Sequence, residues 1–395
     1  MVAAEIFDMD TISDYSFDRL SDYFEILKQK MRVAVVFGGD KSRPGSVLYQ
    51  TFNPRPWKSY EIVAKDIMDT LEEIGFKNVV VMPDDMTLLD NLKKEKIHLA
   101  WLNTGGVQGY IPTSHAAAML EMAGVPYVGP NPQNAAILDN KHVFKYMLEK
   151  FGIRTSPFVV WSRSSLSASL GDDLESLESV FGDYRGPFIV KPVSGRASIN
   201  INIVDCIDAL PEAVDLVHDI TQNLVVVEKY LSGSEYCVSI SGPITCVDGV
   251  FVKKQSPFAF SVLERILDKD ELIFTSMDKK PITDTRARLC GSEADQRTNH
   301  AICLIAQEIY TKFFLETLVR VDLRADEHGQ IYVLEANPKP DLKKPTTKVT
   351  SLTCLGLSEH EMSYSDLIAG LLADRLDYLF RYRKQNALHL EKLLA

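Results

Sequence analysis

Four side chains suited to metal or anion binding are predicted to share one face of a hairpin near the end of the chain. The run LVRVDLR (318–324) alternates apolar with charged residues, as a strand with one buried face does. A turn signal, DEHG, separates it from a returning strand, QIYVLEAN (330–337). With an even-numbered loop, antiparallel pairing brings to one face Arg320, Asp322, Glu335 and Asn337.

Such a set of side chains is suited to phosphoryl chemistry. Mg²⁺ prefers oxygen ligands, and proteins usually hold it through one or two carboxylates together with substrate phosphates. A neighbouring guanidinium, that of Arg320, can stabilise a developing oxyanion or a transferring phosphoryl group. The alternative is a surface hairpin whose charges are only solvated. The Asn-Pro that ends the run and the lysines upstream favour the metal site.

Two lysines upstream are candidates for phosphate binding. Lys191 lies at the end of a predicted strand at 187–192 and is followed by a loop of small residues, PVSGRASINI (192–201). Such a loop lets backbone N–H groups approach phosphate oxygens closely. Lys141 opens a predicted helix. Neither lysine alone indicates phosphate binding. The loop after Lys191 lacks the GKS or GKT of a P-loop, and most exposed lysines, as Lys141 could be, are only solvated.

Two glutamates flank the end of another predicted strand. Glu228 and Glu235 lie seven residues apart in EKYLSGSEY (228–236), which spans a strand end and a Ser-Gly turn. The segment is either an ordinary connection between strands or a clamp for adenosine. In a clamp, backbone groups bind the base and a carboxylate binds the ribose hydroxyls.

The elements that must position these residues begin with alternating strands and helices. Strand patterns at 32–39, 78–82, 97–102 and 125–128, with helical patterns between them, predict a parallel sheet with right-handed crossovers. We therefore expect a Rossmann-like domain. Its glycine turn, FGGDKSRPG, is not the GxGxxG of dinucleotide-binding proteins, which disfavours an NAD-dependent oxidoreductase.

The order of the motifs resembles that of the ATP-grasp superfamily. A lysine opens a helix, a strand lysine precedes a small-residue loop, and E-K-x-L-x-x-x-E, R-x-D and E-x-N follow. Within the superfamily, the chain is similar to D-alanine–D-alanine ligases and related ATP-dependent amino-acid ligases over about residues 31–345. The resemblance implies an α/β fold in which two α+β subdomains, at 139–235 and 236–395, sandwich ATP. It places a Rossmann-like domain at 31–138, after an extension at 1–30.

The resemblance also implies a role for each candidate residue. Nucleotide phosphates would be bound by Lys141 and Lys191, and by a covering loop that contributes Ser194, Gly195, Ala197 and the catalytic Ser198. The adenine pocket would be lined by Glu228, Lys229 and Leu231, and the ribose would be bound by Glu235. Two Mg²⁺ ions, which Mn²⁺ can replace, would be ligated by Asp322, Glu335 and Asn337. Arg320 would stabilise the acyl phosphate and the tetrahedral intermediate.

The implied reaction joins a carboxylate to an amine. A carboxylate resists attack because its charge repels the nucleophile and its leaving group is oxide. Transfer of the γ-phosphoryl group of ATP would give an acyl phosphate, which an amine attacks with release of phosphate. Catalysis would rest on positioning and on neutralising the charge of the phosphates.

Three departures from this family lie around the expected substrate pockets. D-alanine–D-alanine ligases usually carry a Ser-x-Glu stretch whose glutamate holds the ammonium of the first amino acid. This chain has PWKS (56–59), after an insertion that contains Arg43 and Arg55, and this cationic stretch suits an acidic substrate better. The EINxxPGMT-like run is EANPKPDLKKP (335–345), so Pro340-Asp341 stand near the oxyanion-hole glycine. The phosphate loop reads SGRASINI in place of a glycine–serine–serine–x–glycine run.

Because the ATP and metal positions are kept and the substrate positions differ, we expect an amino-acid ligase of specialised metabolism. One alternative is the housekeeping D-alanine–D-alanine ligase of cell-wall synthesis. Another is a non-catalytic ATP-binding protein on the same scaffold, which would be expected to lose its metal ligands.

The composition of the chain bears on its partners and its location. The 395 residues carry 43 Lys and Arg against 54 Asp and Glu, a net charge of −11, which argues against nucleic-acid binding. The six cysteines are widely spaced without a CxxC pair, as in reduced cytosolic proteins. No apolar run reaches the ~18 residues of a membrane span, and the acidic N-terminus does not read as a signal peptide. We expect a cytoplasmic protein, homodimeric as members of this family often are, whose partners are small amino-acid substrates.

Overall fold

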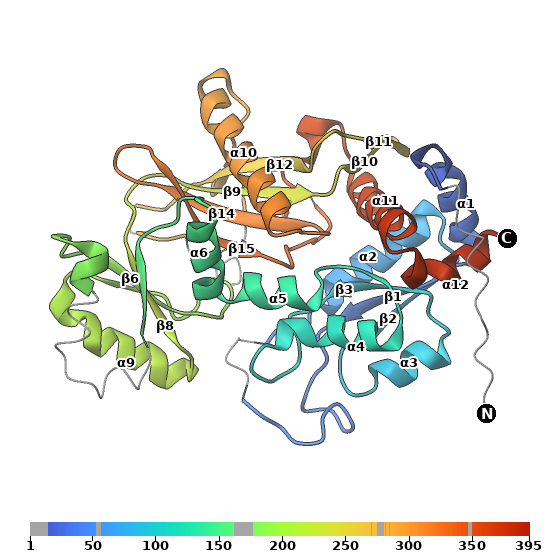
Figure 1. Ribbon diagram of the computed structural model, residues 1–395, viewed down its shortest axis with the longest axis horizontal. Helices are drawn as coiled ribbons and strands as arrows, with labels where there is room; N and C mark the ends of the chain where they lie inside the picture. Colours follow the sequence, from blue (N-terminus) through green and yellow to red (C-terminus); the bar gives the residue numbers. More distant parts are fainter. Residues whose placement is uncertain are drawn as a thin grey trace.

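A four-stranded parallel sheet organises the N-terminal region of the computed structural model (Figure 1). The structure describes residues 15–52, 57–161, 177–269, 271–274, 280, 282–283, 285–346 and 350–395. The strand order is β2-β1-β3-β4, with β1 (Arg32–Phe37), β2 (Asn78–Pro83), β3 (Leu99–Asn103) and β4 (Tyr127–Val128). The helices along this stretch are α2 (Glu61–Ile74), α3 (Leu88–Lys94) and α4 (His115–Ala123).

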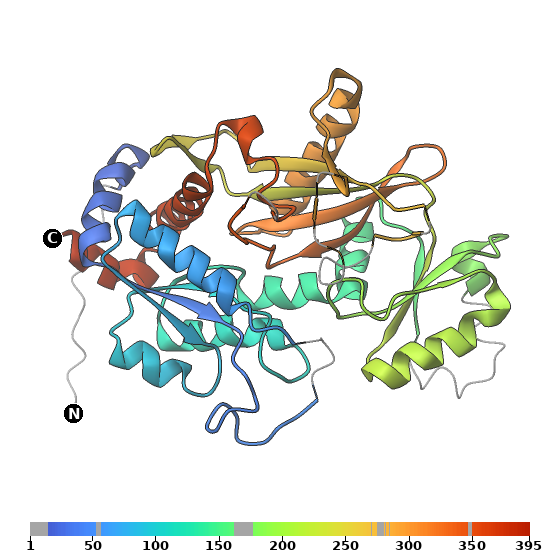
Figure 2. The ribbon, with the colours of Figure 1, turned by 180° about the vertical axis from the view of Figure 1, so that it is seen from behind.

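Helices cover both faces of this sheet, because successive strand residues point to opposite faces and those of β1 are mostly apolar. Val33 and Val35 belong to a core that also contains the apolar residues of α2. Ala34 and Val36 belong to a second core, shared with α3 and α4. The sheet is thereby buried on both sides, and its carboxyl-terminal edge faces the rest of the molecule (Figure 2).

A second, antiparallel sheet has the order β5-β8-β6-β7. Its strands are β5 (Phe158–Trp161), β6 (Phe188–Pro192), β7 (Asn202–Val204) and β8 (Val225–Lys229). The alternation along β6 and β8 divides their residues between two faces. Phe188, Val190 and Val227 pack on helix α9 (Leu210–Thr221), which leaves Lys191 and Glu228 on the opposite face.

The third sheet holds the predicted hairpin and has the order β13-β12-β9-β14-β15. The strands are β9 (Glu235–Ser241), β12 (Phe258–Arg265), β13 (Ala287–Leu289), β14 (Val319–Ala325) and β15 (Ile331–Asn337). Val319, Val321 and Leu323 are buried against the apolar residues of α6 (Lys141–Lys150) and α10 (Gln296–Lys312). The alternate residues of β14 therefore face away from these helices.

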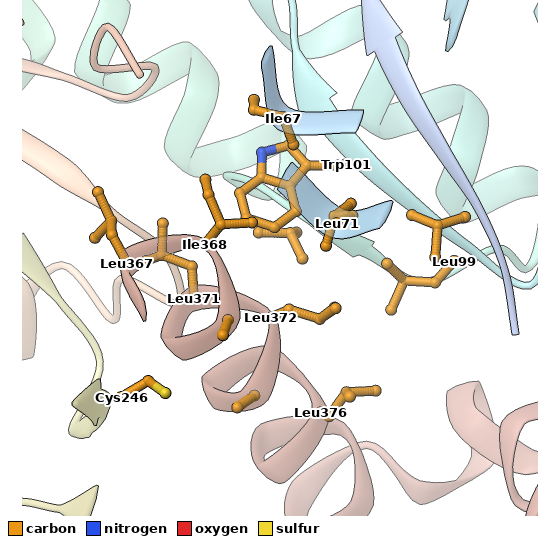
Figure 3. Packing of buried hydrophobic residues seen from close by; sticks show 14 of the residues in the cluster. Ile67, Leu71, Leu99, Trp101, Cys246, Leu367, Ile368, Leu371, Leu372 and Leu376 are labelled. Atoms are coloured by element: carbon orange, nitrogen blue, oxygen red, sulfur yellow. The ribbon is translucent and has the colours of Figure 1, made fainter. Parts of the chain in front are cut away.

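A long helix near the C-terminus, α11 (Tyr364–Tyr382), packs against the N-terminal sheet. Helix α11 begins with a capping box between Ser363 and Asp366. Figure 3 shows Ile368 and Leu372 of α11 near Trp101 of β3.

The other elements are α1 (Leu20–Lys30), α5 (Pro132–Asp139), α12 (Lys384–Leu394), β10 (Ile244–Val247), β11 (Val250–Lys253) and the short 3-10 helices η2 (Phe17–Arg19), η3 (Pro112–Ser114), η4 (Ile207–Ala209), η5 (Glu293–Asp295) and η6 (Leu357–His360).

The predicted α/β fold is confirmed, with a parallel sheet followed by antiparallel sheets. The end of the chain forms two helices, since α11 ends before Arg383 and α12 begins at Lys384. Strands β5, β10, β12 and β13 were not predicted from sequence. Within the described ranges, no helix is both long and apolar enough to cross a membrane.

Candidate active site

A cavity lies between the two antiparallel sheets. Its walls come from β6 and β8 on one side and from β9, β12, β14 and β15 on the other, and it encloses about 860 Å³ including its open mouth. Many of the residues predicted from sequence line it, namely Lys191, Ala197, Ser198, Glu228, Lys229, Leu231, Glu235, Arg320, Asp322 and Glu335.

A smaller hollow shares four of these residues with the cavity and therefore lies beside it. It is lined by two further predicted residues, Lys141 and Gly195. Ser194 and Asn337 line neither space. The structure thus brings twelve of the fourteen sequence-predicted residues to these two adjoining spaces.

The β14–β15 hairpin brings the four predicted residues to one face, but the expected even-numbered loop is wrong, because the last pair, Ala325 and Ile331, encloses five residues. Asp322 lies opposite Glu335 and Arg320 lies opposite Asn337, so all four share one face. A bulge follows Asp322 and shifts the register of the rest of the hairpin. The guanidinium of Arg320 holds the Asp322 carboxylate in two places, with Nε 2.8 Å from Oδ1 and Nη2 3.0 Å from Oδ2.

Arg265, which sequence reasoning missed, joins two of the predicted carboxylates. Its Nη2 lies 2.8 Å from Asp322 Oδ2 and its Nη1 lies 2.8 Å from Glu235 Oε1. Arg324 Nη1 lies 3.4 Å from the other oxygen of Glu235. Burial raises the pKa of Asp322, but the guanidinium groups of Arg265 and Arg320 outweigh burial and lower it to about 2. The carboxylate is therefore held as the anion.

Glu228 is shared by two buried lysines. Its Oε1 lies 2.9 Å from Lys191 Nζ and 3.4 Å from Lys145 Nζ. Burial lowers the pKa of Lys145 to about 8, against the opposing effect of Glu228. Burial alone would raise the pKa of Glu228, yet the two lysines lower it. Lys145 was missed from sequence, although it lies one helical turn after Lys141 on the same face of α6.

Lys141 connects the start of α6 to both sheets. Its Nζ lies 3.2 Å from Glu335 Oε2, and its backbone N–H donates to the carbonyl of Val193 just after β6. Burial raises the pKa of Glu335, but the Lys141 ammonium more than offsets this and lowers it. The first lysine and the second carboxylate of the predicted site therefore form one ion pair.

The predicted phosphate loop is fixed at its start and strongly turned at its centre. The buried hydroxyl of Ser194 donates to Asp139 Oδ2 at 2.5 Å, so this side chain anchors the loop to the end of α5. Ala197 and Ser198 both have left-handed backbone conformations, with φ of 57° and 52°. Such turns can direct successive N–H groups toward an anion. Ser198 Oγ donates to the carbonyl of Phe274 across the cavity at 3.2 Å.

The cavity also has apolar residues in its lining. Ile189, Leu231 and Phe274 supply apolar lining, and Phe274 carries the Arg265 guanidinium 5.3 Å from its ring centroid. Lys229 extends over Tyr184, with Nζ 4.9 Å from the ring centroid. Apolar walls with a few fixed polar groups are typical of small-molecule sites.

The oxygen donors of the hairpin fit a Mg²⁺ that is shared with phosphates. Among the described residues, no three His, Cys, Asp or Glu side chains gather in a metal-binding cluster. Asp322 and Glu335 supply two carboxylates, which suffice where substrate phosphates complete the shell. Asn337 stands directly beyond them in β15, and its Oδ1 accepts the N–H of Lys339 at 3.0 Å. A cation bound here would compete with Arg265 and Arg320 for the oxygens of Asp322.

Comparison with known proteins identifies the family of the chain. The model of the family described as "D-ala D-ala ligase C-terminus" matches residues 147–373, more than half of the chain. The uncharacterized protein y4sG of Sinorhizobium fredii (strain NBRC 101917 / NGR234) is 27% identical over 355 residues, which cover 87% of this chain and 96% of that protein.

Solved structures share the fold along most of the chain. The D-alanine–D-alanine ligase from Bacillus anthracis complexed with ATP superposes with a TM-score of 0.60 at 20% identity, over 88% of this chain and 98% of that one. The VanG D-Ala:D-Ser ligase from Enterococcus faecalis superposes with a TM-score of 0.62 at 16% identity, over 87% of this chain and 99% of that one. Taken with the family match, these likenesses support an ATP-dependent ligase. The chain belongs to the D-alanine–D-alanine ligase family of the ATP-grasp superfamily.

Proposed function

We propose that the protein is an ATP-dependent ligase that joins the carboxyl group of one substrate to the amine of another, in specialised metabolism. The observation that carries this proposal is the pairing of Lys141 with Glu335 and of Arg320 with Asp322 around one cavity. Cations for phosphate groups and carboxylates for a metal ion meet there, as phosphoryl transfer to a carboxylate requires.

The proposal assigns ATP, Mg²⁺ and the first substrate to different parts of the molecule. ATP would lie between the two antiparallel sheets, with adenine near Leu231 and phosphates near Lys191 and the loop that carries Ser198. Mg²⁺ would bind the carboxylates of Asp322 and Glu335. We assign the nucleotide site to subdomains at 139–235 and 236–395, and the first substrate to the domain at 31–138.

The chain's own residues would act mainly by position and charge. When bound, ATP and Mg²⁺ supply a transferable γ-phosphoryl group, which makes a carboxylate reactive toward an amine. Lys191, fixed by Glu228, holds positive charge at the phosphates. Arg320, fixed by Asp322, offers its guanidinium to the negative charge that develops on the reacting carboxyl group. Because these cations are preorganised by ion pairs, little reorganisation is needed during the reaction.

Two alternatives make different predictions. A housekeeping D-alanine–D-alanine ligase would require D-alanine, whereas the cationic run Pro-Trp-Lys-Ser (56–59) stands where that family usually has an ammonium-binding glutamate. A non-catalytic ATP-binding protein would have no need for Asp322 and Glu335 together. The discriminating experiment measures phosphate release from Mg·ATP with L- and D-amino acids, singly and in pairs. Release that requires two non-D-alanine substrates supports the proposal, and release with D-alanine alone supports the housekeeping enzyme.

A further inference from the structure

A further cavity opens where the N-terminal domain meets the last two helices of the chain. It encloses about 970 Å³ including its open mouth. One wall comes from α4, β4 and the start of α5, and the other from α11 and the start of α12. In the part of the chain that the structure describes, this cavity shares no lining residue with the two spaces of the candidate active site. The proposed reaction therefore does not account for it.

A buried arginine forms part of the second wall. Arg375 is only 6% exposed, and its Nη1 donates to Glu316 Oε2 at 2.9 Å. Its guanidinium lies 5.3 Å from the ring centroids of both Tyr127 and Tyr378. Its Nε has no hydrogen-bond partner among the described residues, although buried N–H groups almost always have an acceptor. This wall thus holds a fixed cation that lacks one acceptor.

A second arginine, Arg383, lines the same wall but is 57% exposed. Its Nε donates to the hydroxyl of Tyr378 at 3.3 Å, and its Nη2 lies 3.7 Å from Glu316 Oε1. Both oxygens of Glu316 are therefore engaged, one by Arg375 and the other by Arg383 and by the hydroxyl of Tyr378. Because two guanidinium groups share one carboxylate, this side of the cavity carries a net positive charge.

The opposite wall carries a carboxylate. Glu121 lies on α4, and its Oε1 accepts the hydroxyl of Tyr127 at 2.7 Å. Among the ion pairs of the described residues, none joins Glu121 to Arg383. The pKa of Arg383 is nevertheless raised, mainly by its hydrogen bond with Tyr378 and also by the charge of Glu121. The two charges are therefore near enough to interact across the cavity and too far apart to pair.

The start of α5 contributes a further place for negative charge. Asn131 is the N-cap of this helix, and its Oδ1 accepts the N–H of Asn134 at 2.8 Å. Gln133 belongs to the first turn and lines the cavity. The first N–H groups of a helix have no acceptor within the helix, and the helix dipole favours an anion there. A carboxylate in the cavity could therefore accept from Arg383 and from the first turn of α5.

We infer that this cavity binds a zwitterion with an α-ammonium, a carboxylate and an apolar side chain, a chemistry that free amino acids and dipeptides share. Its carboxylate would lie at Arg383 and the start of α5, and its ammonium would lie at Glu121. The apolar side chain would pack on Leu120, Val125 and Leu379 of the lining. Two opposite charges that the fold holds apart favour a ligand that carries both. The inference goes beyond the proposed function, since the proposed reaction does not use this cavity.

The test measures ligand binding to the full-length protein by calorimetry, with Mg·ADP present at saturation. The ligands are L-leucine, D-leucine and leucylleucine, and each is compared with N-acetylleucine, which lacks the ammonium, and with leucinamide, which lacks the carboxylate. At least one of the three zwitterions is expected to bind at least tenfold more tightly than either blocked compound. Tighter binding of leucine would assign the site to a free amino acid, and tighter binding of leucylleucine would assign it to a dipeptide.

Substitutions of the two facing charges locate the ligand. Glu121→Gln and Arg383→Gln change exposed side chains, and each should weaken binding of the zwitterion at least tenfold. Arg383→Lys should restore most of the affinity. The matched control is Lys392→Gln, which removes a positive charge from α12 outside the cavity and should leave the affinity unchanged. The Kd for Mg·ADP should stay within twofold in all four variants, because none of these residues lines the nucleotide cavity.

Three results would overturn the inference. They are the absence of binding by any zwitterion at millimolar concentration, equally tight binding of a blocked compound, and binding that survives both Glu121→Gln and Arg383→Gln. Each of them leaves the ligase proposal standing, because that proposal rests on residues of the other cavity.

Discussion

Arg265 and Asp322 lie on strands that are separated by β9, yet Arg265 Nη2 contacts Asp322 Oδ2 at 2.8 Å. The same guanidinium contacts Glu235 Oε1 at 2.8 Å. One arginine therefore links the carboxylate proposed to bind a metal ion with the carboxylate proposed to bind ribose. Loss of this residue should affect both ends of the nucleotide site.

Replacing Arg265 with methionine should be strongly destabilising. Asp322 would keep only Arg320 and Glu235 only Arg324, and removing one partner of a buried ion pair typically costs about 3–5 kcal/mol. Thermal unfolding and Mg·ATP binding measure the two consequences. Arg288→Met is the control, since Arg288 also pairs with two carboxylates but is 46% exposed, and surface pairs contribute about 0–1 kcal/mol. Equal effects of the two variants would contradict the role given to Arg265.

The two lysines on Glu228 should differ in their effect on nucleotide binding. Lys191 lines the cavity, whereas Lys145 lies behind Glu228 and lines none of the cavities described above. We expect Lys191→Met to raise the Kd for Mg·ADP about tenfold or more and Lys145→Met to raise it about threefold or less. Calorimetric titration measures both values. A larger effect from Lys145 than from Lys191 would show that phosphates bind elsewhere.

The metal assignment predicts that Asp322→Asn and Glu335→Gln each abolish Mg²⁺-dependent ADP formation. Because Asp322→Asn also removes the partner of two buried guanidiniums, thermal unfolding of each variant is measured alongside its activity. Each amide removes one negative charge from the donors that would hold the cation. We expect activity to fall by about 100-fold or more. Mn²⁺ binding in the presence of nucleotide, followed by electron paramagnetic resonance, should weaken in parallel. Glu264→Gln, at a β12 carboxylate that pairs with Arg288 away from the cavity lining, should change neither quantity. Unchanged Mn²⁺ binding in both site variants would remove Asp322 and Glu335 from the metal site.

Asp374 predicts a pH dependence of stability away from the active site. Burial raises the pKa of this α11 carboxyl from 3.8 to about 7, while Oδ1 accepts the N–H of Ile244. The folded form thus binds the Asp374 proton more tightly than the unfolded form does. The stabilisation that comes from this protonation is present below about pH 4 and is lost as pH rises through about 7. A tenfold change in proton affinity is about 1.4 kcal/mol. Asp374→Asn should therefore stabilise the protein by about 2–4 kcal/mol at pH 8 and by much less at pH 5.

Asp377, three residues further along the same helix, is the control for this prediction. Burial raises its pKa, but Arg381, Tyr15 and Lys253 outweigh burial and lower it. Asp377→Asn should therefore destabilise the protein at pH 8. Melting temperatures of both variants are measured at pH 5 and pH 8, and at pH 8 the change should be upward for Asp374→Asn and downward for Asp377→Asn. Changes in the same direction would show that burial of Asp374 does not determine the effect of its substitution.

The alternation along each strand of the hairpin could be predicted, because strand side chains have a period of two. The shared face did not follow from the expected even-numbered loop, because five residues lie between Ala325 and Ile331 and the bulge after Asp322 restores its pairing with Glu335. The sum of the paired residue numbers, 657 for Asp322 and Glu335, is odd as expected. The bulge after Asp322 could not be predicted, since no glycine or proline signals it in VRVDLRA or YVLEAN. The ends of the first three parallel strands agree with the sequence pattern to within about two residues.

The contacts that sequence reasoning missed are non-local. Arg265 meets Asp322 across β9 and 57 residues along the chain, and β12 carries no regular alternation that would assign its faces. Lys339 meets Tyr60 only because the segment after β15 folds onto the start of α2. Lys145 is the exception, since a second lysine one turn after Lys141 was a local signal that could have been used.

The most direct test of the central claim is the stoichiometry of the reaction. Purified protein is incubated with Mg·ATP and pairs of acids and amines, including L- and D-amino acids, and both ADP and amide product are measured. For a carboxylate–amine ligase, ADP and amide should form in equal amounts, and only when both substrates and Mg²⁺ are present. Tight binding of Mg·ATP with no ADP formed from any pair would contradict the central claim and favour a non-catalytic ATP-binding protein.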